Sequence, residues 1–360
     1  MKHQDLLKFD WWLIAPVTIL VAMGLTVLLS IDPAFFRSQL LSLIIALVAF
    51  ILFSRLNLDG VKQLTLPIYI VSVLLLVVVL ILGIESRGAV RWIDVFGIRF
   101  QFSEILKPVL AFVLCAYLSE HPKPTPRLLI TVIVFLAPVF LLIALQPDLG
   151  NALIYGGVTL FVLLVYGFSW KWFGLLLAPF VLVSPLFWAR LHDYQKQRLL
   201  TFLHPANDPL GASYNVIQAI IAVGSGRFLG KGLSQGTQSG LRFLPERQTD
   251  FIFATLTEGL GFIGGAVVIL AFAFLCYRIY VIFREVDDPF GKAFTTATFA
   301  FILIHFFVNV GMNVGLLPIV GVTLPFLSFG GSSLLSSFMF LGILSAISMS
   351  GRSRRVLEIH

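Results

Sequence analysis

The sequence is poor in charged residues and in cysteine. Only 12% of its 360 residues are Asp, Glu, Lys or Arg, about half the share found in an ordinary soluble protein. This scarcity excludes a soluble enzyme, a nucleic-acid-binding protein and a disordered chain, because each of these needs many more polar and charged groups. Both cysteines, Cys115 and Cys276, lie inside apolar stretches. We therefore expect buried thiols and no disulfide framework.

The sequence contains long apolar segments that have few or no charged residues. Hydrophobic residues make up 58% of the chain, in blocks long enough to cross a hydrocarbon layer about 30 Å thick. The alternating pattern of barrel strands is absent, so each block is predicted to be a helix. We predict an all-α polytopic membrane protein, one membrane domain over 1–360, with spans at about 12–31, 38–54, 66–84, 103–119, 128–145, 151–167, 170–188, 251–283, 292–314 and 331–350.

The distribution of Lys and Arg predicts the orientation of these ten helices. With both termini in the cytoplasm, thirteen cations fall on inner segments and four on short outer loops, namely Arg37, Arg87, Arg91 and Arg99. Seven more lie in a large outer loop at 189–250, and long loops contribute little to the positive-inside rule. We therefore expect both termini inside and the large loop outside.

The large outer loop is basic and contains one apolar segment. The segment YNVIQAIIAV at 214–223 is predicted to form a helix that lies in the membrane interface. The loop's seven cations outnumber its four acids, which indicates that something anionic docks on the outer face. Attraction to the headgroups of membrane lipids is the simpler alternative.

Ionisable side chains also stand at the outer ends of two spans. Glu104 and Lys107 share a helix face at spacing i,i+3, which fits either a structural ion pair or a pair that lines a polar substrate site. Asp148, in QPDLG at 146–150, fits either a turn or a functional carboxylate.

The densest polar cluster precedes the eighth span, in FLPERQTDFIF at 243–253. Helix capping would explain Asp250 at the membrane edge, but it explains neither Glu246 nor Arg247. Glu258 lies two turns further along and is a second functional candidate, because acids inside a membrane are costly. In the ninth span, Asn309 and Asn313 could bind sugar hydroxyls or, more commonly, another helix.

Two glycine-rich segments lead to different predictions. In LPFLSFGGSSLL at 324–335, the Gly-Gly-Ser start of the last span, with Ser332, can present N–H groups to an anion or let helices pack closely. The segment GSGRFLGKG at 224–232 lacks the spacing of a phosphate-binding motif and is predicted to be a plain loop. Neither HExxH nor CxxC occurs, so the sequence does not indicate a zinc site.

In this order along the chain, the motifs resemble those of the SEDS family (shape, elongation, division, sporulation). The resemblance covers essentially the whole chain and rests on RGAVRWI at 87–93, SEILK at 103–107, QPDLG at 146–150, ERQTDFIF at 246–253 and FGGSS at 329–333. The length and the short basic tail are more similar to RodA-type elongation members than to division members. Gly259 replaces a second acid after Glu258, and Phe102 replaces the usual Pro before Ser103.

The resemblance implies a peptidoglycan glycosyltransferase at the outer face of the bacterial cytoplasmic membrane. It would polymerise lipid II, release polyprenyl pyrophosphate and work beside a class B penicillin-binding protein. Asp250 would be the catalytic base or would bind a divalent cation, Mg²⁺ or Mn²⁺. Pyrophosphate leaves without a general acid when cations stabilise its charge. The substrate-binding residues would be Arg87, Arg91, Trp92, Glu104, Lys107, Asp148, Lys196, Arg198, Glu246, Arg247 and Ser332.

Two other functions fit the same composition. A lipid II flippase would use Glu104, Lys107 and Glu258 to line a polar path, but such a path must cross both leaflets. The polar candidates concentrate near the outer face, which favours polymerisation. A non-catalytic scaffold for the penicillin-binding protein would leave the outer-face charges unexplained.

Overall fold

The computed structural model describes residues 10–86, 89–95, 98–121, 123–174, 196 and 213–358. Within these residues, nine helices are long and apolar enough to cross a membrane. They are α1 (Trp11–Ile31), α2 (Pro33–Ser54), α4 (Thr65–Leu82), α5 (Phe102–Ser119), α6 (Pro126–Leu145), α7 (Leu149–Tyr166), α12 (Ile252–Glu285), α13 (Pro289–Asn313) and α14 (Gly331–Glu358). These helices confirm the predicted helical membrane protein. The predicted span at 170–188 lies mostly outside the described residues.

Three of the helices begin before the apolar run that predicts them, because each has a capping residue and a proline at its start. A capping residue is followed directly by a proline at the first helical position, as in Asp32-Pro33, Thr125-Pro126 and Asp288-Pro289. The cap oxygen accepts a backbone N–H that has no partner within the helix, and proline lacks the N–H that would be unpaired there. The caps therefore let α2, α6 and α13 begin two to five residues before the predicted spans.

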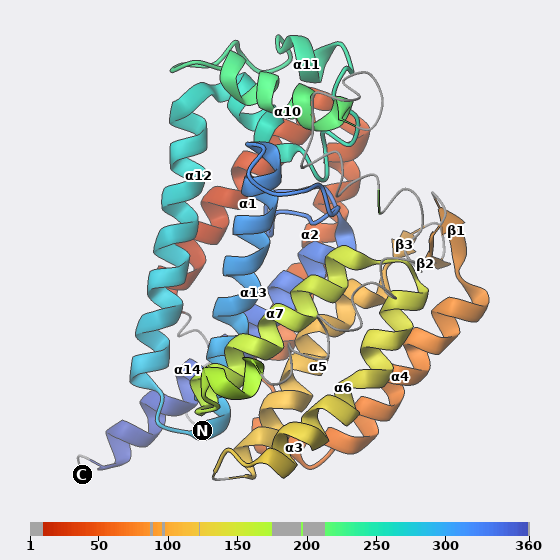
Figure 1. Cartoon of the computed structure of the whole chain (residues 1–360). Coiled ribbons are helices and arrows are strands. Elements are labelled where there is room, and N and C mark those ends of the chain that lie inside the picture. Colours follow the sequence, from red (N-terminus) through yellow and green to blue (C-terminus); the bar gives the residue numbers. More distant parts are fainter. Residues whose placement is uncertain are drawn as a thin grey trace.

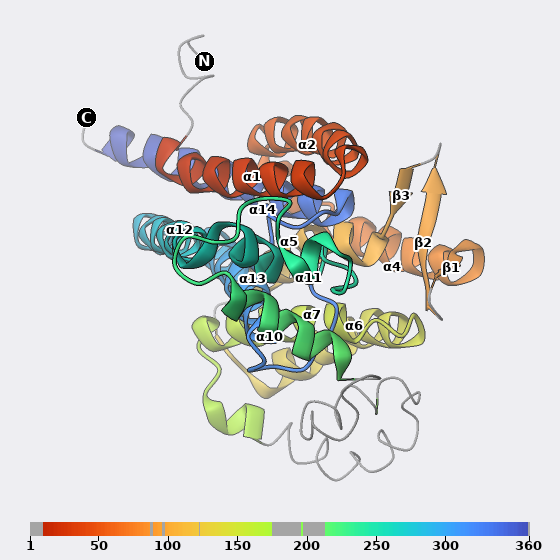
Figure 2. The ribbon, with the colours of Figure 1, turned by 90° about the horizontal axis from the view of Figure 1, so that it is seen from above.

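Three helices form the centre of the bundle and the others face outward. In the apolar stretch of α14, 89% of the residues are buried, and in α5 and α13 the share is 67%, against 17% in α4. Aromatic stacking between Phe301 of α13 and Phe340 of α14, with ring centroids 4.3 Å apart, belongs to this centre. Figure 2 shows α5, α13 and α14 inside a ring of outer helices. Polar side chains on these central helices are therefore shielded from lipid.

The two ends of the bundle differ in structure (Figure 1). The short α3 (Leu58–Lys62), the start of α1 and the end of α14 lie at one end. The opposite end contains α10 (Tyr214–Ser225), α11 (Thr237–Gly240) and three strands. We call it the outer end, following the predicted orientation. α10 is the helix predicted at 214–223, and it lies across the top of the bundle.

A small antiparallel sheet forms in the first outer loop, which the sequence analysis did not predict. Its strands are β1 (Ile84–Ser86), β2 (Ala89–Val95) and β3 (Ile98–Phe100), in the order β1-β2-β3. Trp92 is opposite Ile84, and Asp94 is opposite Arg99. The sheet leads directly into α5, so it positions the arginine of β2 above the start of that helix.

The helix α12 is broken near its outer end. Gly261 has φ +68° and ψ −162°, which is far from helical geometry. The loop after α10 fills the break: Lys231 and Gly232 donate their N–H groups to the carbonyls of Glu258 and Gly259, each at 3.0 Å. In return, Phe262 donates to the carbonyl of Arg227 at 2.8 Å. The loop thus satisfies backbone groups that the broken helix leaves unpaired.

Candidate functional site

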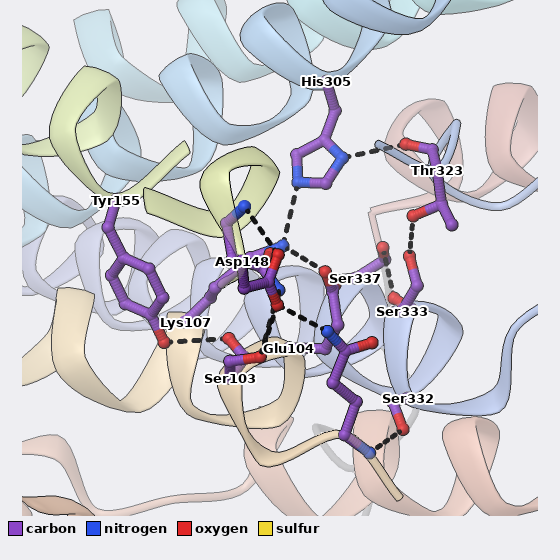
Figure 3. A network of polar contacts seen from close by, with 12 residues as sticks. Ser103, Glu104, Lys107, Asp148, Tyr155, His305, Thr323, Ser332, Ser333 and Ser337 are labelled. Atoms are coloured by element: carbon purple, nitrogen blue, oxygen red, sulfur yellow. Dashed lines mark hydrogen bonds and ion pairs between the residues drawn. The ribbon is translucent and has the colours of Figure 1, made fainter. Parts of the chain in front are cut away.

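Asp148 is the centre of a buried polar cluster at the outer end (Figure 3). It caps α7, where its Oδ1 accepts the N–H of Asn151 at 3.3 Å. Its Oδ2 accepts hydrogen bonds from Gln101 and Asn151, both at 2.8 Å, and from Ser103 at 3.3 Å. Arg91 of β2 lies 3.8 Å away across the top. The turn predicted at Asp148 is therefore a helix cap that also joins α5, α7 and the sheet.

Lys107 lies one and a half turns below the start of α5 and is 3% exposed. Its Nζ donates to Glu104 Oε1 at 2.7 Å and lies 3.2 Å from His305 Nε2. His305 Nδ1 lies 2.9 Å from the carbonyl oxygen of Thr323, which can only accept. The proton is therefore on Nδ1, and Nε2 accepts from the ammonium. An ammonium has three donors, so Lys107 keeps one beyond these two bonds.

Two buried polar atoms beside this pair have no hydrogen-bond partner among the described atoms. They are Glu104 Oε2 and Arg91 Nε. Buried polar atoms are nearly always paired, so an unpaired one indicates a place for a water molecule or a ligand. The ion pair predicted as one alternative is thus present, and it leaves hydrogen-bonding capacity unused.

Asp250 lies in the turn at 246–251, just before α12, and is half-buried. Asn309 and Asn313 of α13 each donate to its backbone carbonyl at 3.0 Å. This confirms that the two asparagines bond within the protein. A Cβ atom built on Gly321 would lie 3.6 Å from Asp250 Oδ2. The carboxylate therefore points toward the segment between α13 and α14.

The segment 314–330 connects the two groups of residues. Its residue Val320 lies against Gly150 at the start of α7, where a Cβ atom would meet the Val320 carbonyl at 2.7 Å. Thr323 binds His305 and also Ser333 of α14, at 2.7 Å between the hydroxyls. Ser332 accepts the N–H of Gln101 at 2.9 Å. The Asp148 cluster, the Lys107 pair and Asp250 are therefore arranged around one segment at the outer end.

Comparison with known proteins identifies the family of this chain. A family model described as a cell cycle protein of the FtsW/RodA/SpoVE type matches residues 7–353. The chain belongs to the FtsW/RodA/SpoVE family. The peptidoglycan glycosyltransferase MrdB of Escherichia coli K12 is 40% identical over 283 residues, which cover 78% of this chain and 76% of MrdB. Stage V sporulation protein E of Bacillus subtilis is 37% identical over 79% of this chain and 78% of its own length.

Solved structures of the family have the same fold. A chain of a peptidoglycan synthase complex that coordinates polymerization and crosslinking has a TM-score of 0.83 and 30% identity, covering 96% of this chain and 99% of that chain. The rod shape determining protein RodA of Thermus thermophilus has a TM-score of 0.70 and 26% identity, covering 97% and 98%. The resemblance seen in the motifs of this FtsW/RodA/SpoVE protein is thereby confirmed.

The other predicted site residues lie in several places. Trp92 is half-buried in β2. Glu246 accepts the hydroxyl of Thr249 at 3.1 Å within the Asp250 turn. Arg247 lines a different cavity, described below. Arg87 and Arg198 lie outside the described residues, and Lys196 is described without its neighbours in the chain, so the structure does not relate it to the site.

Glu258, the second acidic candidate, is engaged in holding the outer loop. Its side chain is completely buried, and it accepts the N–H groups of Gln238 at 2.9 Å and Ser239 at 2.8 Å. Lys231 lies 3.5 Å away. These contacts anchor the loop that fills the break in α12, so the carboxylate is part of the scaffold.

Sequence reasoning missed His305, Gln101 and Ser103 as members of the site. One signal for His305 was present: it precedes Asn309 and Asn313 at intervals of four, so the three share one face of α13. Gln101 and Ser103 had no such signal, because their bonds to Asp148 depend on how α5 and α7 meet.

Proposed function

We propose that this FtsW/RodA/SpoVE protein is a peptidoglycan glycosyltransferase of the elongation type that polymerises lipid II at the outer face of the cytoplasmic membrane. The observation on which the proposal rests is the grouping of Asp250, Lys107 and Asp148 around the segment 314–330 at the outer end. Relatives that match most of the chain have this activity in their names.

Asp250 is assigned the role of base. It takes the proton of the acceptor hydroxyl as that oxygen bonds to the anomeric carbon of the donor sugar. The bond from this carbon to the diphosphate breaks, and the diphosphate leaves with the electron pair. One base is sufficient, because the leaving group needs charge stabilisation rather than a proton.

The leaving diphosphate is assigned to Arg91 and Lys107. Both are cations held by carboxylates, and both have a donor left over: the third Lys107 proton and the unpaired Arg91 Nε. Glu104 and Asp148 orient them, and the free Glu104 Oε2 can accept a sugar hydroxyl. Trp92, Glu246 and Ser332 are assigned to the binding of the sugar and diphosphate in the same region, and Arg87, Lys196 and Arg198 are assigned to a shared basic surface.

No step is assigned to a divalent cation. Among the described residues, no three His, Cys, Asp or Glu side chains are grouped closely enough to bind one ion. The amide nitrogens of Asn309 and Asn313 donate to the Asp250 carbonyl, whereas Mg²⁺ and Mn²⁺ prefer oxygen ligands. The roles above therefore use the side chains of this chain alone.

The interior below Lys107 favours polymerisation over transport. The cavity there has a volume of about 20 Å³, the size of one water, and is lined by apolar side chains such as Leu110, Leu114 and Phe301. A lipid II headgroup could not pass through it, so a flippase would need a route elsewhere. A scaffold function would leave the polar cluster without a use.

The proposed partner is a class B penicillin-binding protein, and the proposed orientation has both termini in the cytoplasm. A structure of a peptidoglycan synthase complex with the same fold supports the partner. α1 begins and α14 ends at the same end of the bundle, which supports termini on one side of the membrane.

The direct test uses purified protein in detergent with fluorescent lipid II, with and without the partner. Glycan ladders should form with the wild-type chain and should be absent with Asp250→Ala. A parallel vesicle assay measures movement of lipid II between leaflets. Movement of lipid II without ladder formation would replace the proposal by the flippase function.

A further inference from the structure

A polar cavity opens at the outer end, away from the Lys107 pair. It has a volume of about 160 Å³ and lies between the end of α1, the loop before α11 and the start of α12. Its walls include Ser30, Ser234, Thr255 and two arginines, Arg242 and Arg247, and none of its lining residues is acidic. We call it the outer cavity. Figure 2 shows the loop between α10 and α11 crossing α12 toward α1, where Ser234 donates to the Ser30 carbonyl at 3.0 Å.

The charges of the two arginines act on each other. Neither arginine belongs to an ion pair found among the described residues. Burial lowers the pKa of Arg247, and the positive charge of Arg242 lowers it further. The negative charge of Asp32 raises it and offsets these effects only in part. Asp32 is occupied as the cap of α2, where it accepts the N–H of Ala34 at 2.7 Å. Two like charges that share one cavity repel each other, and an anion bound between them would relieve this repulsion.

The outer cavity is separate from the Lys107 pair, because neither Glu104, Lys107 nor His305 lines it. Asp250 points toward Gly321, whereas Arg247 lines the cavity beside α1. Arg247 precedes Asp250 by three residues, so their Cα atoms are at most about 11 Å apart. An anion in the cavity is therefore close to the proposed base but is not in contact with the leaving group at Arg91 and Lys107.

We infer that Arg242 and Arg247 bind the diphosphate of the acceptor substrate, an inference that rests on the proposed polymerase function. Both substrates of such a polymerase have a lipid diphosphate. The donor's diphosphate is attached to the reacting carbon, but the acceptor's is a whole disaccharide away from the reacting hydroxyl. One set of cations cannot hold both groups. Two guanidiniums that make no ion pair with the described residues offer paired N–H donors, which suit the oxygens of a diphosphate.

The test measures binding and turnover in four proteins: wild type, Arg242→Gln, Arg247→Gln and the control Arg227→Gln. Arg227 is an exposed arginine of the same loop that does not line the cavity. The binding probe is farnesyl diphosphate added to the detergent-solubilised protein, with phosphatidylglycerol as competitor. We expect two sites per chain in the wild type and in Arg227→Gln. In the two cavity variants, the affinity of one site should fall roughly tenfold or more.

In turnover, the cavity variants should raise the KM for lipid II and leave kcat close to that of the wild type. Their Tm without ligand should not fall, because neither guanidinium has a partner among the described residues that its loss would leave unpaired. Unchanged binding in both cavity variants would overturn the inference. So would equal losses in Arg227→Gln that disappear at high salt, or equal competition by phosphatidylglycerol, since both indicate general attraction to anionic headgroups. If the wild type binds two diphosphates but forms no glycan, it is the polymerase function that fails.

Discussion

Asn309 and Asn313 hold Asp250 through its backbone carbonyl, which every residue has. Both bonds can form in Asp250→Ala as well. We therefore expect a folded variant in which lipid II polymerisation is lowered by roughly 10²–10⁴-fold. Quantified glycan ladders and thermal unfolding test this together. A well-folded Asp250→Ala protein with near-normal polymerisation would rule out the base.

A second prediction at the scale of one residue concerns His305. It connects Lys107 to the Thr323 carbonyl, so His305→Leu leaves a buried ammonium proton and a carbonyl unpaired, at a cost of about 1–3 kcal/mol each. We expect kcat to fall at least tenfold and Tm to fall as well. His305→Gln retains an acceptor for Lys107 and should recover most of kcat. His121→Leu, at the other end of α5, is the matched control. Equal kcat values in the Leu and Gln variants would show that the contact with Lys107 does not matter for turnover.

At the scale of elements, the break in α12 is the main departure from a bundle of straight helices. A Cβ atom on Gly261 would collide with the backbone of Gly230 and would lie 2.5 Å from the Phe228 carbonyl oxygen, in a backbone region unfavourable for other residues. Gly261→Ala should therefore destabilise the loop that fills the break, by at least about 1–3 kcal/mol. Limited proteolysis should cut residues 226–240 faster. Gly224→Ala is the control, since its Cβ atom would meet nothing within 4 Å. Equal cleavage of the two variants would contradict the prediction.

The helices were predictable from the sequence because a membrane requires long apolar stretches whose backbone bonds are internal. Glu104 and Lys107 were predictable as a pair because helical spacing alone places them together. The break at Gly261 was not, because it depends on donors and acceptors from a loop thirty residues earlier in the chain. The strands at 84–100 are too short to give a clear alternating pattern, although β2 contains Val90, Trp92 and Ile93, which favour strands. The role of Glu258 could not be predicted either, because burial looks the same for a scaffold acid and a functional one.

At the scale of the whole molecule, the charged groups assigned to chemistry lie at the end opposite the start of α1. This end must face outward if lipid II polymerisation occurs there. We predict that a membrane-impermeant maleimide added to intact cells labels Gly224→Cys, in open space at the outer end, and does not label Gln63→Cys, at the exposed end of α3. Both changes are made in a chain with Cys115→Ala and Cys276→Ala, and neither alters the charges that orient the helices. Gln63→Cys should react only after the cells are opened. The reverse pattern would put Asp250 and both arginines of the outer cavity in the cytoplasm, and polymerisation at the outer face would then be impossible.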